Sequence, residues 1–251
     1  MIAGISDMDT TDLFTSEYLT AIQKGTERCA SVVASRLTGL MNIGSVIDIG
    51  CGNGAWLAEF MRAGVQDVLG VDGPYVPGSI LQIPADKYVG MDLRRRMSLN
   101  RTCDLVLCLE VAHYLDANDH PAFADYLAAL SPCILFSCAI PGQPGKNHVS
   151  PQWHDYWHRL FQQRDYAAFD FIRPELWHNE NIPLHFRQNI FLYVRSDHLQ
   201  DQAMKNIAPL ARANCLTLVD MDSIRTAMAL RATLRRLPGL LRQKLFGRGG
   251  V

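Results

Sequence analysis

The fold is decided by one short stretch of the sequence, Val46-Ile47-Asp48-Ile49-Gly50-Cys51-Gly52-Asn53-Gly54. The residues before the first glycine form an apolar run typical of a buried strand, and the closely spaced glycines indicate a tight turn. Residues 55–62 then carry apolar side chains at helical spacing. A strand, a glycine turn and a helix in this order bring bare backbone against a nucleotide-like ligand. The stretch therefore predicts a nucleotide-binding α/β domain.

Further apolar runs, separated by turns and amphipathic stretches, predict four more strands at 67–71, 87–90, 105–109 and 134–137. Helical spacing lies between the strands, and it also covers residues 16–40. Because strands alternate with helices, we expect a parallel sheet with right-handed crossovers. The predicted fold class is α/β: a Rossmann-like seven-stranded, mostly parallel sheet with an antiparallel last strand, N-terminal helices and a helical C-terminal tail.

The pattern changes after the fifth strand. Residues 153–164 predict a helix, 166–172 a strand, and 189–195 a last strand after a polar and aromatic loop through His185. The last two strands are too close in sequence for a crossover helix, so we expect an antiparallel hairpin with a long loop. Residues 1–196 should form one domain that begins with a helical segment, 1–44, and residues 197–251 a helical, basic extension.

Composition limits the classes of protein to which the chain can belong. With 251 residues, 48% hydrophobic and 20% charged, the chain suits one large globular domain. Its formal net charge of -1 provides no general attraction to nucleic acid, and we expect no nucleic-acid partner. The 7 cysteines include no CxxC pair, which indicates free thiols in a reducing compartment. Signal-peptide features and a run of about 18 apolar residues are lacking, so we expect a cytoplasmic protein.

Residues 223–251 contain seven basic residues, no acidic residue and interleaved leucines. A basic amphipathic helix can lie on an anionic membrane, bind a partner helix or cover its own domain. Peripheral membrane contact, self-packing and homo-oligomerisation therefore stay open for this tail. The pair Pro238-Gly239 interrupts the helix and weakens the membrane interpretation.

Two carboxylates narrow the identity of the ligand. Asp72 ends the second predicted strand, where an acid can accept both hydroxyls of a ribose, and it weakens the alternative that the glycines only make a turn. A nicotinamide site usually has the spacing G-x-G-x-x-G, whereas this loop has G-x-G-x-G after Asp48. A carboxylate there would repel phosphate but suits an ammonium group and a cationic sulfur. The residues therefore favour S-adenosylmethionine (SAM) over a nicotinamide cofactor.

Residues 18–194 resemble the class I SAM-dependent methyltransferases. Their first motif is similar to 46–54, their second to 69–72 and their third to 88–93. The resemblance implies that the glycines line the methionine part of SAM, that Asp72 binds its ribose, and that Asp92 and Met91 meet the adenine. Met91 as plain core and Asp92 as a helix N-cap stay open. The expected cofactor residues are Asp48, Gly50, Cys51, Gly52, Gly54, Asp72, Gly73, Met91, Asp92, Leu93 and Glu110, and the expected product is S-adenosylhomocysteine (SAH).

Ligands of such sheets lie outside the carboxyl ends of the strands, and this geometry selects the candidates for catalysis. Methyl transfer to a hydroxyl requires alignment and removal of a proton, and histidine is the natural base near neutral pH. We expect His148, in a Gly/Pro-rich loop, and His113, after the fourth strand, to be catalytic. No ligand cluster has diagnostic metal spacing, so we assign no metal ligand; a divalent ion on His113, Asp116 and His148 is the alternative.

Aromatic and polar residues after the fifth strand could form the wall that a sugar or polyol requires. The expected substrate residues are Tyr18, Tyr114, Gln143, Asn147, Trp153, Trp177, Arg187 and Asn189. The segments around residues 141–153 and 173–189 resemble bacterial methyltransferases associated with surface-glycan or secondary-metabolite assembly. The chain departs from that group at His113-Tyr114 and at Ser150-Pro151.

The sequence thus predicts O-methylation of a hydroxyl on a sugar, glycan or other small polar metabolite. The alternatives are N- or C-methylation of a natural product and a SAM-binding homologue without catalysis.

Overall fold

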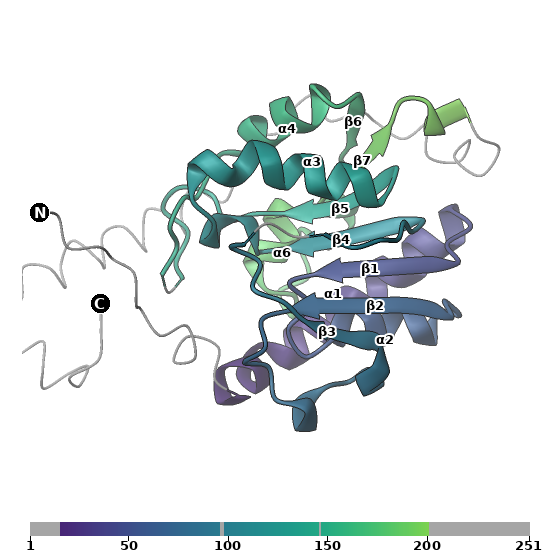
Figure 1. Cartoon of the computed structure of the whole chain (residues 1–251), viewed down its shortest axis with the longest axis vertical. Helices are drawn as coiled ribbons and strands as arrows, with labels where there is room; N and C mark the ends of the chain where they lie inside the picture. The colour runs from purple at the N-terminus through teal and green to yellow at the C-terminus, as the bar shows by residue number, and fades with distance from the viewer. Residues whose placement is uncertain (1–15, 96–97, 146, 201–251) are drawn as a thin grey trace, which may run out of the picture.

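The computed structural model describes residues 16–95, 98–145 and 147–200, with side chains described for residues 23–199 within these ranges. Its centre is a seven-stranded sheet in the order β3-β2-β1-β4-β5-β7-β6 (Figure 1). Strand β7 is antiparallel to both of its neighbours, and the other pairs are parallel. The strands are β1 (Ser45–Ile49), β2 (Asp67–Asp72), β3 (Tyr88–Gly90), β4 (Leu105–Leu109), β5 (Cys133–Ser137), β6 (Tyr166–Phe169) and β7 (Phe191–Arg195). The predicted fold class is confirmed for the sheet.

Helices cover both faces of the sheet, which explains why β4 and β5 are buried along their whole length. One hydrophobic core contains side chains of α1 (Ser16–Leu40), α2 (Ala55–Arg62), α5 (Ile172–Leu176) and α6 (Leu184–Asn189). The second core contains side chains of α3 (His120–Leu130) and α4 (His154–Gln162). Figure 1 shows the sheet between these two groups of helices.

The region between β6 and β7 differs from the sequence prediction. Strand β6 ends at Phe169 rather than at residue 172, and the expected loop contains the short helices α5 and α6. Asn189, the expected first residue of the last strand, is instead the last residue of α6. Burial of Ile172 and Phe186 against the first core stabilises these short helices, which a local apolar pattern does not reveal. The predicted antiparallel hairpin itself is confirmed.

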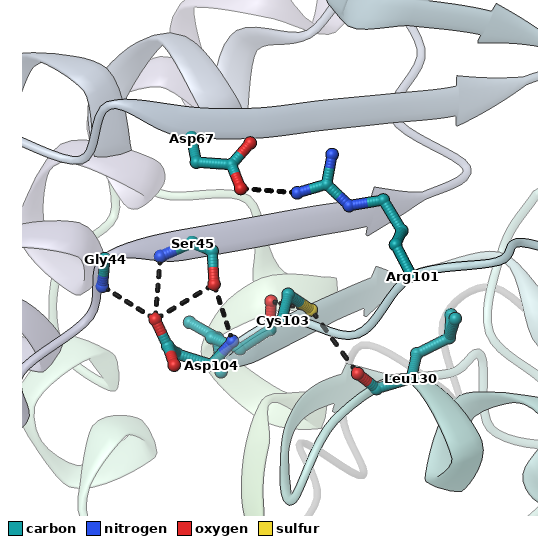
Figure 2. Close-up of polar contacts among 8 residues, drawn as sticks. Gly44, Ser45, Asp67, Arg101, Cys103, Asp104 and Leu130 are labelled. Atoms are coloured by element: carbon teal, nitrogen blue, oxygen red, sulfur yellow. Dashed lines mark hydrogen bonds and ion pairs between the residues drawn. The ribbon is translucent and has the colours of Figure 1, made fainter.

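Polar contacts fix the register of the strands at their amino ends, away from the glycine loop (Figure 2). The Asp104 carboxylate oxygen Oδ2 accepts hydrogen bonds from the backbone N–H groups of Gly44 and Ser45, both at 2.8 Å. Arg101 pairs with Asp67 at 2.5 Å. These contacts join the segment before β4 to the starts of β1 and β2, and they leave the opposite edge for a ligand.

Several expectations concern residues outside those described. Residues 1–15 of the N-terminal segment and residues 201–251 of the basic tail belong to this group. The proposed division at residue 196 stays a prediction. In the part of the chain that the structure describes, no helix is long and apolar enough to cross a membrane. The six cysteines within the described ranges are free and buried.

Candidate functional site

The glycine loop follows β1 directly and lies at the carboxyl end of the sheet. Gly50, Gly52 and Gly54 have φ angles of 83°, 54° and 80°, a region that glycine adopts without strain. The N–H of Gly50 donates to the carbonyl of Val71 in β2 at 2.7 Å. A Cβ atom on Gly50 would lie 2.1 Å from Cγ2 of Val111, so the close approach of the two segments requires glycine there.

Two buried carboxyl groups lie behind this loop. Asp48 is 2% exposed, and its Oδ2 atom has no hydrogen-bond partner among the described residues. Burial raises the pKa of Asp48 well above its usual range, and the neighbouring Asp72 raises it further. A buried carboxylate without a partner is costly, so a cationic ligand would stabilise the site. This orphaned atom fits the ammonium or sulfonium group expected of SAM.

Asp72, at the end of β2, is held by backbone donors. Its Oδ2 accepts from Gly52 N–H at 2.7 Å, and its Oδ1 accepts from Gly73 N–H at 2.6 Å. Burial raises the pKa of Asp72, while these hydrogen bonds oppose the rise. The Tyr75 hydroxyl also donates to Oδ1, at 2.8 Å. Sequence reasoning did not select Tyr75, because a tyrosine in a loop carries no local signal of such a contact.

Cys51, in the same loop, packs its side chain against strand β2. A Cβ atom on Gly70 would lie 2.7 Å from the Cys51 sulfur, which therefore packs against the strand β2. Burial raises the pKa of this thiol well above its usual range. Cys51 thus offers a ligand its backbone rather than a reactive sulfur.

The expected adenine contacts lie after β3. Met91 donates its N–H to the carbonyl of Asp72 at 2.7 Å, and both Met91 and Leu93 pack against the second core. The Asp92 carboxylate binds the Arg94 side chain through both oxygens, at 3.0 and 3.1 Å, and this contact lowers the pKa of Asp92. Asp92 also accepts the N–H of Arg94 at 3.1 Å, in a turn rather than at a helix N-terminus.

On the other half of the sheet edge, three segments meet at Glu110. This residue follows β4 in a left-handed conformation with φ 58°, and its N–H donates to the Ser137 carbonyl at 3.0 Å. Its carboxylate accepts from the Gln143 amide at 2.8 Å and from the Asn189 amide at 3.1 Å. Asn189 also donates to Gln143 Oε1 at 2.8 Å. The antiparallel direction of β7 brings Asn189 to this edge, as the sequence predicted.

A buried histidine orients Asn189. His154, the first residue of α4, is 4% exposed, and its Nε2 lies 3.0 Å from Asn189 Oδ1. Arg173 is 1% exposed and donates to the Gln188 carbonyl at 3.0 Å, which holds the end of α6 in place. Neither His154 nor Arg173 was among the expected site residues. Their roles depend on contacts between segments far apart in the sequence.

Of the two expected catalytic histidines, His113 is the more buried, with 1% exposure. Its Nδ1 accepts the N–H of Ala139 at 3.0 Å, so in the neutral ring the proton is on Nε2. Burial, with smaller contributions from His148 and His185, lowers the pKa of His113 to about 2. His113 is therefore a neutral hydrogen-bond donor rather than a ready proton acceptor.

His148 lies directly against His113, with 4.3 Å between the ring centroids, and 5.7 Å from the ring of Tyr114. It is half-buried. The loop that carries it is anchored, because the N–H groups of Val149 and Ser150 both donate to the His113 carbonyl, at 2.9 and 3.0 Å. The structure thus brings the two expected catalytic histidines and Tyr114 together.

The other expected substrate residues are more scattered. Trp153 caps α4 and is 40% exposed, and Asn147 is exposed with φ 52°. Arg187 donates to the Trp177 carbonyl at 2.7 Å, within the segment of α5 and α6. Tyr18 belongs to α1, but its side chain lies outside those described. Over the described ranges, no group of three or more His, Cys, Asp or Glu side chains is arranged to hold a metal ion.

Comparison with known proteins gives the family. A family model described as a methyltransferase domain matches residues 20–188. The chain belongs to this family and is a methyltransferase. The matched range contains the glycine loop, both buried carboxyl groups and Glu110, and it ends one residue before Asn189.

Solved structures, including two of named methyltransferases, share the fold. SAM-bound CalS10 from Micromonospora echinaspora, an amino pentose methyltransferase, has a TM-score of 0.52 and 15% identity, covering 73% of this chain and 98% of its own. DesVI of Streptomyces venezuelae has a TM-score of 0.53 and 13% identity, with coverage of 76% and 100%. The plantazolicin methyltransferase BpumL with SAH has a TM-score of 0.51 and 19% identity, with coverage of 76% and 91%. A search of curated proteins found no match.

Proposed function

We propose that this methyltransferase uses SAM to methylate a hydroxyl group of a sugar, a glycan or another small polar metabolite, with SAH as the product. The observation that carries the cofactor assignment is the buried Asp48 carboxyl, whose Oδ2 has no partner in the described part of the chain. Bound SAM supplies a methyl group on a cationic sulfur, and its positive charges complement Asp48. The SAM and SAH present in solved structures of the same fold support this assignment.

Different residues of the chain would contact different parts of that cofactor. The glycine loop presents backbone at close range, and Asp72 offers carboxylate oxygens for the ribose hydroxyls. Met91 and Leu93, beside the end of β3, supply an apolar surface for the adenine. Asp92 can meet the adenine amine only by sharing its oxygens with Arg94.

His148 is the base in the proposed reaction. A ring nitrogen of His148 would accept the proton of the acceptor hydroxyl, while SAM, when bound, would supply the methyl group to the oxygen. His113 positions His148 through the ring contact at 4.3 Å. Because Nδ1 of His113 accepts the Ala139 N–H, His113 contributes a hydrogen-bond donor rather than a base.

Glu110 is expected from the sequence among the cofactor residues, but its hydrogen bonds to Gln143 and Asn189, two expected substrate residues, support a place beside a hydroxyl-bearing acceptor instead. Glu110, Gln143 and Asn189 fix one another, and they present oriented oxygen and nitrogen atoms at the edge where the acceptor must lie. Exposed Trp153 adds an aromatic surface on which a sugar ring can stack. An amino group is the second candidate acceptor, because the Glu110 carboxylate can hold an ammonium group before its proton is lost.

A direct assay tests the proposal. The protein is incubated with methyl-labelled SAM and a panel of sugars, sugar nucleotides, polyols and amino sugars, and labelled products are separated. We expect label on a hydroxyl of a sugar-like compound, and stabilisation of the protein against heat by SAH but not by NAD. Label on nitrogen would replace O-methylation by N-methylation, and the absence of stabilisation by SAH would contradict the cofactor assignment.

The cellular setting is proposed on separate grounds. Six buried, free cysteines support a reducing, cytoplasmic location for a biosynthetic enzyme. Peripheral membrane contact and homo-oligomer formation through the basic tail are proposals for residues outside those described. Fractionation of cell extracts and sedimentation of the full chain with anionic vesicles test them.

A further inference from the structure

The hydrogen bonds around Asp72 leave too few acceptor positions for a ribose. An ionised carboxylate offers about four such positions. Three are taken in this structure, by the N–H groups of Gly52 and Gly73 and by the hydroxyl of Tyr75. One position remains, whereas two ribose hydroxyls need two. One of the three donors must therefore leave when both hydroxyls bind.

Tyr75 is the donor that can leave. The N–H groups of Gly52 and Gly73 belong to the backbone of the glycine loop and of the segment after β2, and the fold fixes them. The Tyr75 hydroxyl, in contrast, is at the end of a half-buried side chain that can rotate.

The Tyr75 ring packs against the backbone of Gly73, beside Asp72. A Cβ atom on Gly73 would lie 1.9 Å from Cε1 of Tyr75, so the ring rests on the bare glycine. The Tyr88 hydroxyl donates to the Gly73 carbonyl at 2.6 Å and holds this backbone in place. Burial and the neighbouring Asp72 raise the pKa of Tyr75, so the phenol keeps its proton and remains a donor at neutral pH.

We propose that Tyr75 is a ribose-mimicking residue: its hydroxyl occupies on Asp72 the position of one ribose hydroxyl, and the adenosine part of the cofactor displaces it. The inference rests on the proposed function, since it takes a ribose as the ligand of Asp72. It assigns to Tyr75 a part in cofactor selectivity that the glycine loop does not supply.

This exchange determines how the site discriminates among nucleosides. A ligand with one hydroxyl can use the free position and leave Tyr75 in place. A second hydroxyl replaces the Tyr75 hydroxyl, so it exchanges one hydrogen bond for another and gains little. Without the Tyr75 hydroxyl, the second ribose hydroxyl gains a full hydrogen bond to a charged group.

Calorimetry of the full chain with SAH, adenosine, 2′-deoxyadenosine and 3′-deoxyadenosine tests the proposal. Tyr75→Phe removes the hydroxyl and keeps the ring. We expect it to bind SAH and adenosine roughly tenfold more tightly than the unmodified protein, because a bond to a charged group is worth about that factor or more. At least one deoxyadenosine should bind both proteins equally. Tyr126→Phe is the matched control, since the half-buried Tyr126 in α3 has a hydroxyl without a hydrogen-bond partner among the described residues.

The outcomes separate the inference from the proposed function. Failure of the unmodified protein to bind SAH would overturn both. Binding of SAH with equal or weaker affinity in Tyr75→Phe would overturn the inference alone, because the hydroxyl would then be indifferent to the ribose or would bind it. Equal tightening for adenosine and for both deoxyadenosines would also overturn it, since the gain would not depend on a ribose hydroxyl.

Discussion

The carboxyl groups in the two halves of the sheet edge differ in their hydrogen-bond partners. On the β1–β2 half, Asp48 has a buried oxygen without a partner among the described residues, and Asp72 is held by backbone and by Tyr75. On the β4–β5–β7 half, Glu110 is bound by the side chains of Gln143 and Asn189. The first half is incomplete without a cationic ligand, whereas the second is already a network.

This difference suggests separate tasks. An unpartnered buried carboxyl group favours binding of one charged ligand, because that ligand relieves a desolvation penalty. A network of mutually oriented side chains favours positioning, because each group is held before the acceptor arrives. We call the β1–β2 half of the sheet edge the cofactor half and the β4–β5–β7 half the acceptor half. Variants in the two halves should therefore affect different measurements.

The largest effect is expected at the acceptor half. His148→Ala should lower kcat by about 10²- to 10⁴-fold, the usual contribution of a general base, and leave the affinity for SAH within about twofold. Steady-state kinetics, with the acceptor that becomes methylated in the assay, measure kcat. Calorimetry measures the affinity for SAH. The exposed His178→Ala is the control. A parallel loss of SAH affinity would place His148 in the cofactor half and break the comparison.

A variant in the cofactor half should change the affinity for SAH, which His148→Ala leaves unchanged. Asp72→Ala removes both carboxylate oxygens, and we expect SAH to bind at least about tenfold more weakly, since one net hydrogen bond to a charged group is lost once the exchange with the Tyr75 hydroxyl is counted. Calorimetry measures the change, with Asp86→Ala at an exposed position as the control. A change below about fivefold would show that the ribose does not depend on Asp72.

Network disruption at Asn189 should appear mainly as lost stability. Asn189→Ala removes the Oδ1 atom that lies 3.0 Å from His154 Nε2, and it removes one donor from Glu110. We expect the free energy of unfolding to fall by about 1–3 kcal/mol, with SAH affinity unchanged. Urea unfolding measures this loss, and Asn181→Ala at an exposed position should be neutral. An unchanged midpoint would mean that the network contributes nothing to the fold.

The smallest effect concerns pH. The folded pKa of His113 is lowered to about 2, whereas an unfolded histidine titrates near ~6.5. The unfolded chain thus binds a proton that the folded one does not, so this contribution to stability is complete above about pH 6.5 and decreases as the pH falls. Its slope is at most about 1.4 kcal/mol per pH unit.

Asp48 has a raised pKa, so its contribution to the free energy of unfolding changes with pH in the opposite direction. The effect of His113 is therefore measured as the difference between a variant and the unmodified protein. We expect the free energy of unfolding of His113→Gln to fall less steeply between pH 6.5 and 5 than that of the unmodified protein. His178→Gln at an exposed position should change nothing. Equal slopes for the unmodified protein and His113→Gln would contradict a neutral, buried His113.

The sequence was most informative where neighbours in the chain are neighbours in space. Residues 46–54 carry strand, turn and helix without interruption, and Asp72 follows at the end of the next strand, so the loop and its carboxylates could be predicted. The contact of Asn189 with this edge was also predictable, because an antiparallel β7 must start there. The helices α5 and α6 were missed, since burial against a distant core, rather than local spacing, stabilises them.

By itself, the sequence determined the α/β sheet, the glycine loop and the pair Asp48 and Asp72, because apolar periodicity and glycine spacing act over a few residues. Only the tertiary structure decided that His113 is a neutral donor, that Glu110 lies between two amides and that Tyr75 occupies an oxygen of Asp72. The physical reason is that protonation states and hydrogen-bond partners depend on burial and on distances between segments, and a linear pattern of residue types contains neither.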